Sequence, residues 1–384
     1  STSIRQSTNS TTLVARVFRN GPNRPLFVLH VGPPKTATTS IQCGLDRLSQ
    51  QLALQDSYYF VGKRCPNSNG TMANGEASIP GHHLMMGLIN ANPHSRGFEK
   101  LQERMDYHRS RGNHMILSLE AMANHLEDRP ETWDLFLSLL EGWNVRIVVN
   151  YRHYFEWIQS LYFQQHIGKK YRLYWPDQHG LVHPSFQTFL SQHLDRWEKE
   201  QPSNDQHSWG QHLTLYALQY FSQHFEDVEI FDLHQPGDVV TNFVCQMIPG
   251  ATNTCRHLRE NPFSEPTVKR ESHSFDPHRL AMAAYQQSIL NKKVSRTTAV
   301  EKIAEYLNKH NDLSDPNNLS CLPDGLQAQF LNASVWFEQR IAMSKRKGES
   351  TNSIIHREAS DHARLFEQAV QRNKFCEVNV DHVI

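Results

Sequence analysis

The sequence lacks the long apolar stretch that a membrane-spanning helix requires. Only 38% of its 384 residues are hydrophobic, and no run approaches the roughly 18 consecutive apolar residues of a spanning helix. We therefore expect no stable membrane insertion of the chain as given. The sequence begins at Ser1 rather than at Met, so we expect that an upstream segment, such as a signal peptide or an anchor, has been removed.

The chain also lacks an excess of charge of either sign. It has 39 Lys and Arg residues and 39 Asp and Glu residues, and its formal net charge is zero. A protein that binds nucleic acid through bulk electrostatics needs an excess of positive charge. We therefore expect no nucleic-acid partner, while a local basic pocket remains compatible with this composition.

Two short patterns that mark zinc sites, HExxH and CxxC, are absent. The chain has 23 histidines, but without such a pattern we predict no metal site. It has six cysteines, an even number that permits three disulfides. Cys245 and Cys255 lie close enough in sequence for a short loop to close as one of them.

Signals for a cellular compartment are divided. Four Asn-x-Ser/Thr sequons favour a secretory route weakly, because such sequons also arise by chance. They begin at Asn9, Asn69, Asn318 and Asn332. Six cysteines in 384 residues are also ordinary for a cytosolic chain. The Golgi or secretory lumen and the cytoplasm therefore both stay open.

Strand and helix patterns alternate over most of the chain. Residues 1–24 are rich in Ser, Thr and Asn and are expected to be a flexible lead-in. Short apolar runs predict strands at 26–31, 114–120, 145–152 and 227–233, with helices between them. This alternation predicts the α/β class, with a central, mainly parallel sheet flanked by helices.

The last third of the chain has a different pattern. No clear strand is predicted after residue 265, and helices are expected over 277–309, 324–342 and 356–372. We expect a single domain over 25–384. It consists of an α/β core over 25–265 and a helical extension, 266–384, that packs on this core.

The most informative segment joins the first predicted strand to the next helix and reads GPPKTATTS over residues 32–40. A helix N-terminus offers unpaired N–H groups and the positive end of the helix dipole, which suit phosphate. Gly32 lets the backbone turn closely, and Lys35 adds a full charge. The second glycine of a Walker A loop is absent. The alternative is an ordinary helix start rich in Ser and Thr beside a surface lysine.

The segment FVLHVGPPKTATTSIQ resembles the 5′-phosphosulfate loop of sulfotransferases that use 3′-phosphoadenosine 5′-phosphosulfate (PAPS). Ala37 stands where many members of that family have Gly. The family's second motif is a strand followed by Arg, with a Ser eight residues later in the next helix. The segment VRIVVNYRHYFEWIQS supplies Arg152 and Ser160 at this spacing. The resemblance covers roughly residues 25–265 and implies a P-loop NTPase-like sulfotransferase fold.

The resemblance implies that PAPS and its product PAP are held at two places. The 5′-phosphate would be bound by Gly32, Pro34, Lys35, Thr36, Ala37, Thr38, Thr39 and Ser40. Arg152 and Ser160 would bind the 3′-phosphate, since an Arg at a strand end presents a fork of donors. The late loop at 255–266 lacks the Arg-Lys-Gly run of cytosolic relatives and looks more like the carbohydrate-type and bacterial branch. Arg259 is therefore a further candidate for a phosphate contact, with Arg256 behind it.

The resemblance further implies transfer of a sulfuryl group to an acceptor hydroxyl or amine. Lys35 would assist departure of the leaving group, and no metal ion is required. The acceptor's proton needs a general base, and Glu120 at a predicted strand end is the first candidate. His82 and His83 come next, and His153 is third, although it could equally stack on the adenine.

The acceptor itself stays open among carbohydrates, sterols, phenols and alkaloids, with a slight preference for carbohydrate from the late loop. Its site is expected within residues 58–95 and near 162–175. Two other functions remain. A P-loop nucleotide kinase lacks support because no Walker glycine–lysine pair is present. A non-catalytic nucleotide-binding module is disfavoured by the intact Lys35, Arg152 and Ser160.

Overall fold

The structure is a computed structural model that describes residues 20–62, 65, 94–119, 130–166, 184–200, 213–263, 277, 280–281, 284, 294–309, 319–344, 359–372 and 374–378. The strands are β1 (Leu26–Val31), β2 (Tyr58–Val61), β3 (His114–Ser118), β4 (Asn144–Tyr151), β5 (Asp227–Asp232), β6 (Leu319–Cys321) and β7 (Cys376–Val378). The helices of the α/β core are α1 (Thr38–Arg47), α2 (Ser49–Asp56), α4 (Arg96–Ser110), α6 (Pro130–Leu139), α7 (Tyr154–His166), α8 (Phe186–Glu200), α9 (Leu213–His224), α10 (Val239–Met247) and α11 (Thr252–Glu260). The C-terminal helices are α13 (Arg296–Lys309), α14 (Asp324–Ser344) and α15 (Ala359–Gln371).

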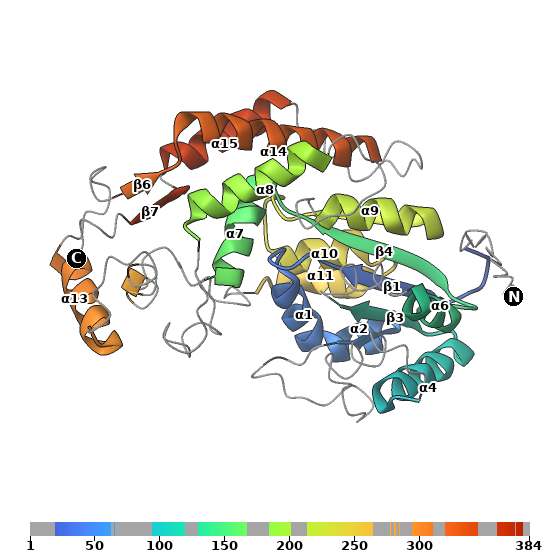
Figure 1. Ribbon diagram of the computed structural model, residues 1–384. Coiled ribbons are helices and arrows are strands. Elements are labelled where there is room, and N and C mark those ends of the chain that lie inside the picture. The colour runs from blue at the N-terminus through green and yellow to red at the C-terminus, as the bar shows by residue number, and fades with distance from the viewer. Residues whose placement is uncertain are drawn as a thin grey trace, which may run out of the picture.

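Five strands form one sheet in the order β2-β3-β1-β4-β5, and every neighbouring pair is parallel (Figure 1). The register places Val31, the last residue of β1, beside Val149 of β4. Strands buried on both faces read as continuous apolar runs, which is why β1, β3 and β4 were recognisable in the sequence. The predicted α/β class with a parallel sheet flanked by helices is confirmed.

Side chains of β1 alternate between two apolar cores, as the pleat of a strand requires. Phe27, Leu29 and Val31 face one core, which α4, α6, α7, α8, α9, α14 and α15 cover. Val28 faces the other core, which α1, α2, α10 and α11 cover. The long C-terminal helices α14 and α15 therefore contribute to the same core as the sheet, on the side of α7, α8 and α9 (Figure 1).

The connections that leave β1 and β4 run toward opposite edges of the sheet. From β1 the chain passes through α1 and α2 to the edge strand β2, whereas from β4 it passes through α7, α8 and α9 to β5 at the other edge. A reversal between adjacent parallel strands opens a crevice at their carboxyl ends, where open α/β sheets bind ligands. The loops that follow β1 and β4 lie at this point.

Three expectations about local structure are wrong. Strands β6 and β7 lie where none was predicted after residue 265, because strands of three residues show no periodicity. Helix α11 occupies the first half of the predicted late loop at 255–266. The helix predicted over 277–309 is interrupted at residues 294–295, and α13 begins only at Arg296.

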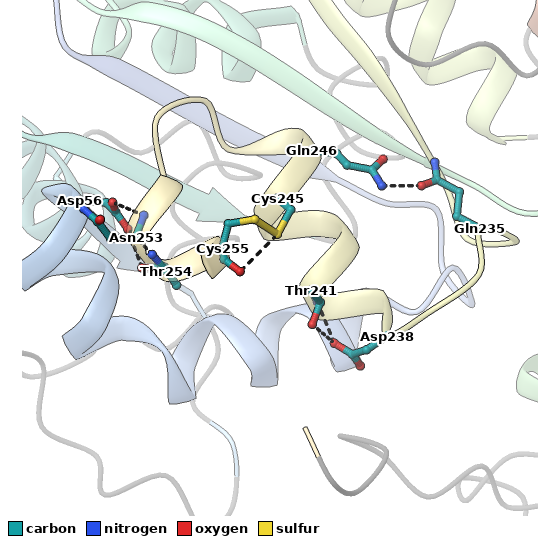
Figure 2. The surroundings of a disulfide bond; sticks show 9 residues. All are labelled: Asp56, Gln235, Asp238, Thr241, Cys245, Gln246, Asn253, Thr254 and Cys255. Atoms are coloured by element: carbon teal, nitrogen blue, oxygen red, sulfur yellow. Dashed lines mark hydrogen bonds between the residues drawn. A yellow bond between two sulfur atoms is a disulfide. The ribbon is translucent and has the colours of Figure 1, made fainter. Parts of the chain in front are cut away.

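All six cysteines are paired. The disulfides are Cys43–Cys65, Cys245–Cys255 and Cys321–Cys376. The second, which the sequence left open as a possibility, joins α10 to α11 (Figure 2). The third cross-links the small antiparallel pair β6 and β7. In the described residues, none of the helices has both the length and the apolar character needed to cross a membrane.

Candidate functional site

Two strand-to-helix links lie next to each other at the carboxyl ends of β1 and β4. Residues 32–37 join β1 to α1, and Arg152 and His153 join β4 to α7. Three donors from the β4–α7 side bond to three consecutive carbonyl oxygens of the first link. They are Trp157 Nε1 to Pro34 O (3.0 Å), Arg152 Nη1 to Lys35 O (3.1 Å) and Asn150 Nδ2 to Thr36 O (2.7 Å). These bonds hold the backbone of Lys35 against the strand end that carries Arg152.

This first link and the start of α1 together form the segment that we call the phosphate loop (residues 32–40), and its backbone is unusual at two positions. Lys35 and Ala37 have φ values of 68° and 57°, in the left-handed region that residues other than glycine seldom adopt. Residues held in such conformations gather at ligand sites. Gly32 is needed for a different reason, because a Cβ there would lie 2.5 Å from Thr38 Oγ1.

The N-terminus of α1 has no side-chain cap. Its N-cap residue is Ala37, and no acidic residue lies in the first turn. The first main-chain hydrogen bond of the helix runs from the N–H of Ile41 to Ala37 O (3.1 Å). The N–H groups of the first helical residues have no acceptor within the helix. Thr38 is 2% exposed, and within the described ranges its Oγ1 has no hydrogen-bond partner. Unpaired donors at a positive dipole end suit an anion.

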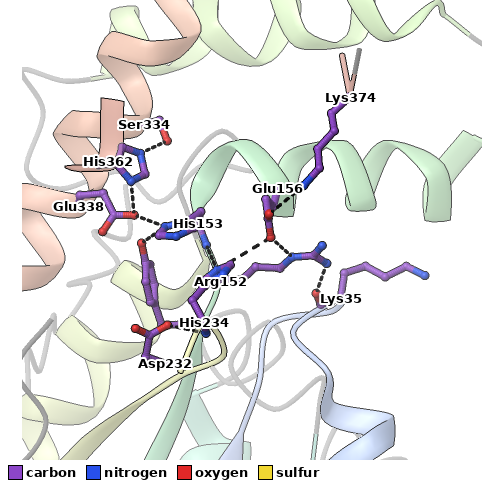
Figure 3. A network of polar contacts seen from close by, with 11 residues as sticks. Lys35, Arg152, His153, Glu156, Asp232, His234, Ser334, Glu338, His362 and Lys374 are labelled. Atoms are coloured by element: carbon purple, nitrogen blue, oxygen red, sulfur yellow. Dashed lines mark hydrogen bonds and ion pairs between the residues drawn. The ribbon is translucent and has the colours of Figure 1, made fainter. Parts of the chain in front are cut away.

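Arg152 belongs to a cluster of charges beside this helix end (Figure 3). Its Nε lies 3.3 Å from Glu156 Oε2, and Lys374 Nζ lies 3.3 Å from Glu156 Oε1. Burial raises the pKa of Glu156, but Arg152, His234 and Lys374 together outweigh it and hold the pKa below its usual value. The carboxylate of Glu156 is therefore ionised and orients Arg152.

Three cations and one carboxylate are linked by direct contacts beside the phosphate loop (Figure 3). Arg152 contacts the main chain of Lys35, and Glu156 contacts both Arg152 and Lys374. Positive charge beside an uncapped helix end attracts a polyanion.

His30, which the sequence analysis did not single out, lies beneath the phosphate loop. It is completely buried one residue before the end of β1, and its Nδ1 lies 2.7 Å from Ser118 Oγ at the end of β3. Burial lowers its pKa to about 4, although the nearby side chain of Asn150 raises it. The ring is therefore neutral at physiological pH and joins the ends of β1 and β3.

The structure brings some of the predicted site residues together and separates others. Lys35 and Arg152 are adjacent, and Ser160 is half-buried on α7, four residues after Glu156 and hence on the same helix face. Arg259 is exposed on α11, as is Arg256, and this helix packs on α2 and α10. No contact joins Arg259 to the phosphate loop in the part of the chain that the structure describes.

The candidate general bases have different outcomes. Glu120, His82 and His83 lie outside the described residues, as does most of the predicted acceptor region. His153 is described and is only 2% exposed, packed against His234 with ring centroids 3.7 Å apart. Its burial disfavours both stacking on an adenine and a role as the base.

Sequence reasoning missed Asn150, Trp157, Glu156 and Lys374. The sequence could have indicated Asn150, because a polar amide within the apolar run VRIVVNY is unusual. Lys374 had none, because it meets Glu156 across 218 residues of sequence. Its main-chain oxygen also accepts a hydrogen bond from Gln159 on α7.

The fold and the site define an α/β protein with a phosphate-suited loop at the switch point of a parallel sheet. No family model matches the chain, and a search of curated proteins finds no significant match. The assignment of a function therefore depends on the geometry of this site together with the two sequence motifs.

Proposed function

We propose that this protein is a sulfotransferase that moves the sulfuryl group of PAPS to an acceptor hydroxyl or amine. One observation carries the proposal. Arg152, which follows the adjacent strand β4, donates a hydrogen bond to the main-chain oxygen of Lys35, just before the uncapped N-terminus of α1. Two groups suited to phosphate therefore lie close together at the carboxyl ends of β1 and β4. PAPS requires two such groups, because it carries phosphate on both the 3′ and the 5′ side of its ribose.

The residues fit such a donor. The N–H groups at the start of α1 and the Thr38 hydroxyl, which has no bonding partner among the described residues, would bind the 5′-phosphate. Arg152, oriented by Glu156, and Ser160 on the same helix face would bind the 3′-phosphate. Lys374 lies at the same carboxylate and adds a cation from the C-terminal extension. The 3′-phosphate separates this donor from ordinary nucleotides.

The chemical role of the chain is alignment and charge stabilisation. PAPS supplies the sulfuryl group, whose bond to the 5′-phosphate oxygen breaks as a bond from the acceptor oxygen or nitrogen to sulfur forms. Lys35 would stabilise the charge that develops on the departing phosphate oxygen. The acceptor's proton would pass to a general base, for which Glu120 remains the first candidate and His82 and His83 the next.

The disulfides bear on where this reaction takes place. Disulfides persist in oxidising compartments and are rare in the cytosol, and all six cysteines of this chain are paired. We infer that the protein works in the secretory lumen or beyond it. A carbohydrate acceptor is consistent with this compartment, while small alcohols and phenols remain alternatives.

An acceptor screen with isotopically labelled PAPS, read by mass spectrometry, tests the proposal. We expect a labelled sulfate ester or sulfamate on at least one acceptor, with PAP released in equal amount and without a requirement for Mg²⁺. Failure to bind PAP in calorimetry would contradict the proposal. Mg²⁺-dependent turnover of ATP would favour a kinase, and tight PAP binding without transfer to any acceptor would favour a non-catalytic module.

A further inference from the structure

Three side chains from distant parts of the sequence meet where the C-terminal extension joins the sheet. His153 follows β4, Glu338 lies in α14 and His362 lies in α15. Figure 3 shows both imidazole rings directed at the same carboxylate. His153 Nδ1 lies 3.0 Å, and His362 Nδ1 3.2 Å, from Glu338 Oε1. We call these three residues the His–Glu–His cluster.

The cluster is buried. His153 is 2%, Glu338 8% and His362 1% exposed. A carboxylate and two imidazoles withdrawn from water are costly unless strong interactions replace their hydration. Such groups are retained in protein interiors chiefly where they pair closely or coordinate a metal ion.

Hydrogen bonds alone serve this cluster poorly. The Nδ1 atom of an imidazole carries at most one proton, so it makes one strong hydrogen bond. Both the Tyr151 hydroxyl and Glu338 Oε1 lie 3.0 Å from Nδ1 of His153. These two oxygens compete for one position on the ring. A cation placed among the three ligand atoms would instead bind both Nδ1 lone pairs and the carboxylate.

The donor set and its surroundings match a divalent zinc-class ion. Zinc binds imidazole nitrogen and carboxylate oxygen at about 2.0–2.2 Å, which puts the ligand atoms of one tetrahedral ion about 3.4 Å apart. The three ligand atoms lie within 4.8 Å of one another, so small side-chain shifts suffice. His362 Nε2 is 2.8 Å from Ser334 Oγ, an outer hydrogen bond of the kind that orients metal-binding imidazoles.

We propose that His153, Glu338 and His362 form a binding site for one Zn²⁺ or similar first-row divalent ion, with the Tyr151 hydroxyl beside it. The ion joins α14 and α15 to the residue directly after Arg152. It fastens the C-terminal extension to the sheet and stands apart from the transfer chemistry, so the site is independent of the proposed function. The sequence could not indicate it, since Glu338 lies 185 residues from His153.

Metal content of the full chain tests this proposal. The protein is purified without chelator, equilibrated with Zn²⁺, dialysed and measured by inductively coupled plasma mass spectrometry, beside His362→Gln, Glu338→Gln and His108→Gln. His108 is a buried histidine of α4 outside the cluster and serves as the matched control. We expect one Zn²⁺ per chain in the wild type and in His108→Gln, and a loss of most of it in the two cluster variants.

A second measurement covers the case in which the cluster variants do not fold. Co²⁺ is added to the chelator-treated wild type, and we expect the intense visible absorption of a four-coordinate ion, displaced by one equivalent of Zn²⁺, together with a higher Tm on Zn²⁺ addition. A wild type that retains no Zn²⁺ and shows only the weak spectrum of hydrated Co²⁺ would overturn the proposal. So would folded cluster variants that bind as much Zn²⁺ as His108→Gln.

Discussion

Helices α1 and α11 begin alike and differ in what stands before their first turn. Each has alanine at its N-cap, Ala37 and Ala251, and neither alanine forms a side-chain cap. At α11 a carboxylate from another element fills the position. Asp56, at the end of α2, accepts hydrogen bonds from Asn253 N (3.1 Å), Thr254 N (2.9 Å) and Thr254 Oγ1 (2.6 Å), as Figure 2 shows.

Helix α10 follows the same rule as α11. Its N-cap Asp238 accepts from the N–H and the hydroxyl of Thr241 (Figure 2). At α1 the described residues provide no such carboxylate, and Lys35 and Arg152 stand there instead. At α10 and α11 the protein thus supplies its own carboxylate. Under the proposed function, the end of α1 is left for an anion that comes with the ligand.

The largest effect should follow from removing the cation at the α1 end. Lys35→Ala should lower the rate of sulfuryl transfer by at least about a hundredfold, because charge on the departing phosphate oxygen loses its stabilisation. The check is single-turnover kinetics with PAPS at saturation. Lys374→Ala, which removes a cation on the C-terminal segment, should retain most of the rate constant. Equal rates in Lys35→Ala and the wild type would contradict the assigned role.

Low pH should destabilise the fold through His30, which lies one residue before the end of β1. Its pKa is about 4 when folded and 6.5 when unfolded, so the unfolded chain binds the additional proton between these values. The contribution of His30 should leave the free energy of unfolding unchanged above pH 6.5. As the pH drops to 4, this group should lower the free energy of unfolding by about 3 kcal/mol. Urea unfolding of the wild type and of His30→Gln across this range measures it. Parallel stability curves would show that His30 is not responsible.

A carboxylate placed before α1 should make this helix resemble α11. Ala37→Asp puts a negative charge at the helix end, in a left-handed conformation that Asp tolerates. We expect PAP affinity to fall more than about tenfold, since the carboxylate repels the 5′-phosphate, while Tm is kept or raised. Ala37→Asn is the uncharged control. Calorimetry that shows equal PAP affinity in the two variants would mean that the 5′-phosphate binds elsewhere.

The reverse change at α11 should affect stability alone. Asp56→Ala removes an acceptor for three hydrogen bonds, and loss of a capping side chain costs about 1–2 kcal/mol. Denaturant titration should show this loss with PAP affinity unchanged, and Asp238→Ala at α10 should behave likewise. A marked loss of PAP affinity in Asp56→Ala would show that α11 takes part in nucleotide binding.

Much of the fold was predictable because its signals are local. The runs 26–31 and 145–152 form central strands that are buried on both faces, and 227–233 contains the half-buried edge strand β5. All three positions were predicted within a residue or two. The edge strand β2 and the three-residue strands β6 and β7 were missed, since their pairing depends on distant segments and, for β6 and β7, on the Cys321–Cys376 disulfide.

The candidate site was predictable where motif and topology coincide. Lys35 and Arg152 were both predicted, and parallel neighbours necessarily bring their carboxyl ends to one edge. The residues that hold them were not, because Trp157 and Lys374 act through contacts that only the folded chain defines. The prediction for Arg259 depended on an expected loop, and the chain forms α11 there.

The central claim is that two neighbouring strand ends bind opposite phosphates of one nucleotide. Isothermal titration of PAP and of 5′-AMP measures it most directly, on the wild type, on Arg152→Ala and on Arg146→Ala, which alters an ion pair with Asp227 at the other end of β4. We expect PAP to bind about 10 to 100 times more tightly than 5′-AMP. Arg152→Ala should lose this preference and Arg146→Ala should keep it. Equal affinities in the wild type, or an undiminished preference in Arg152→Ala, would contradict binding of the 3′-phosphate by Arg152.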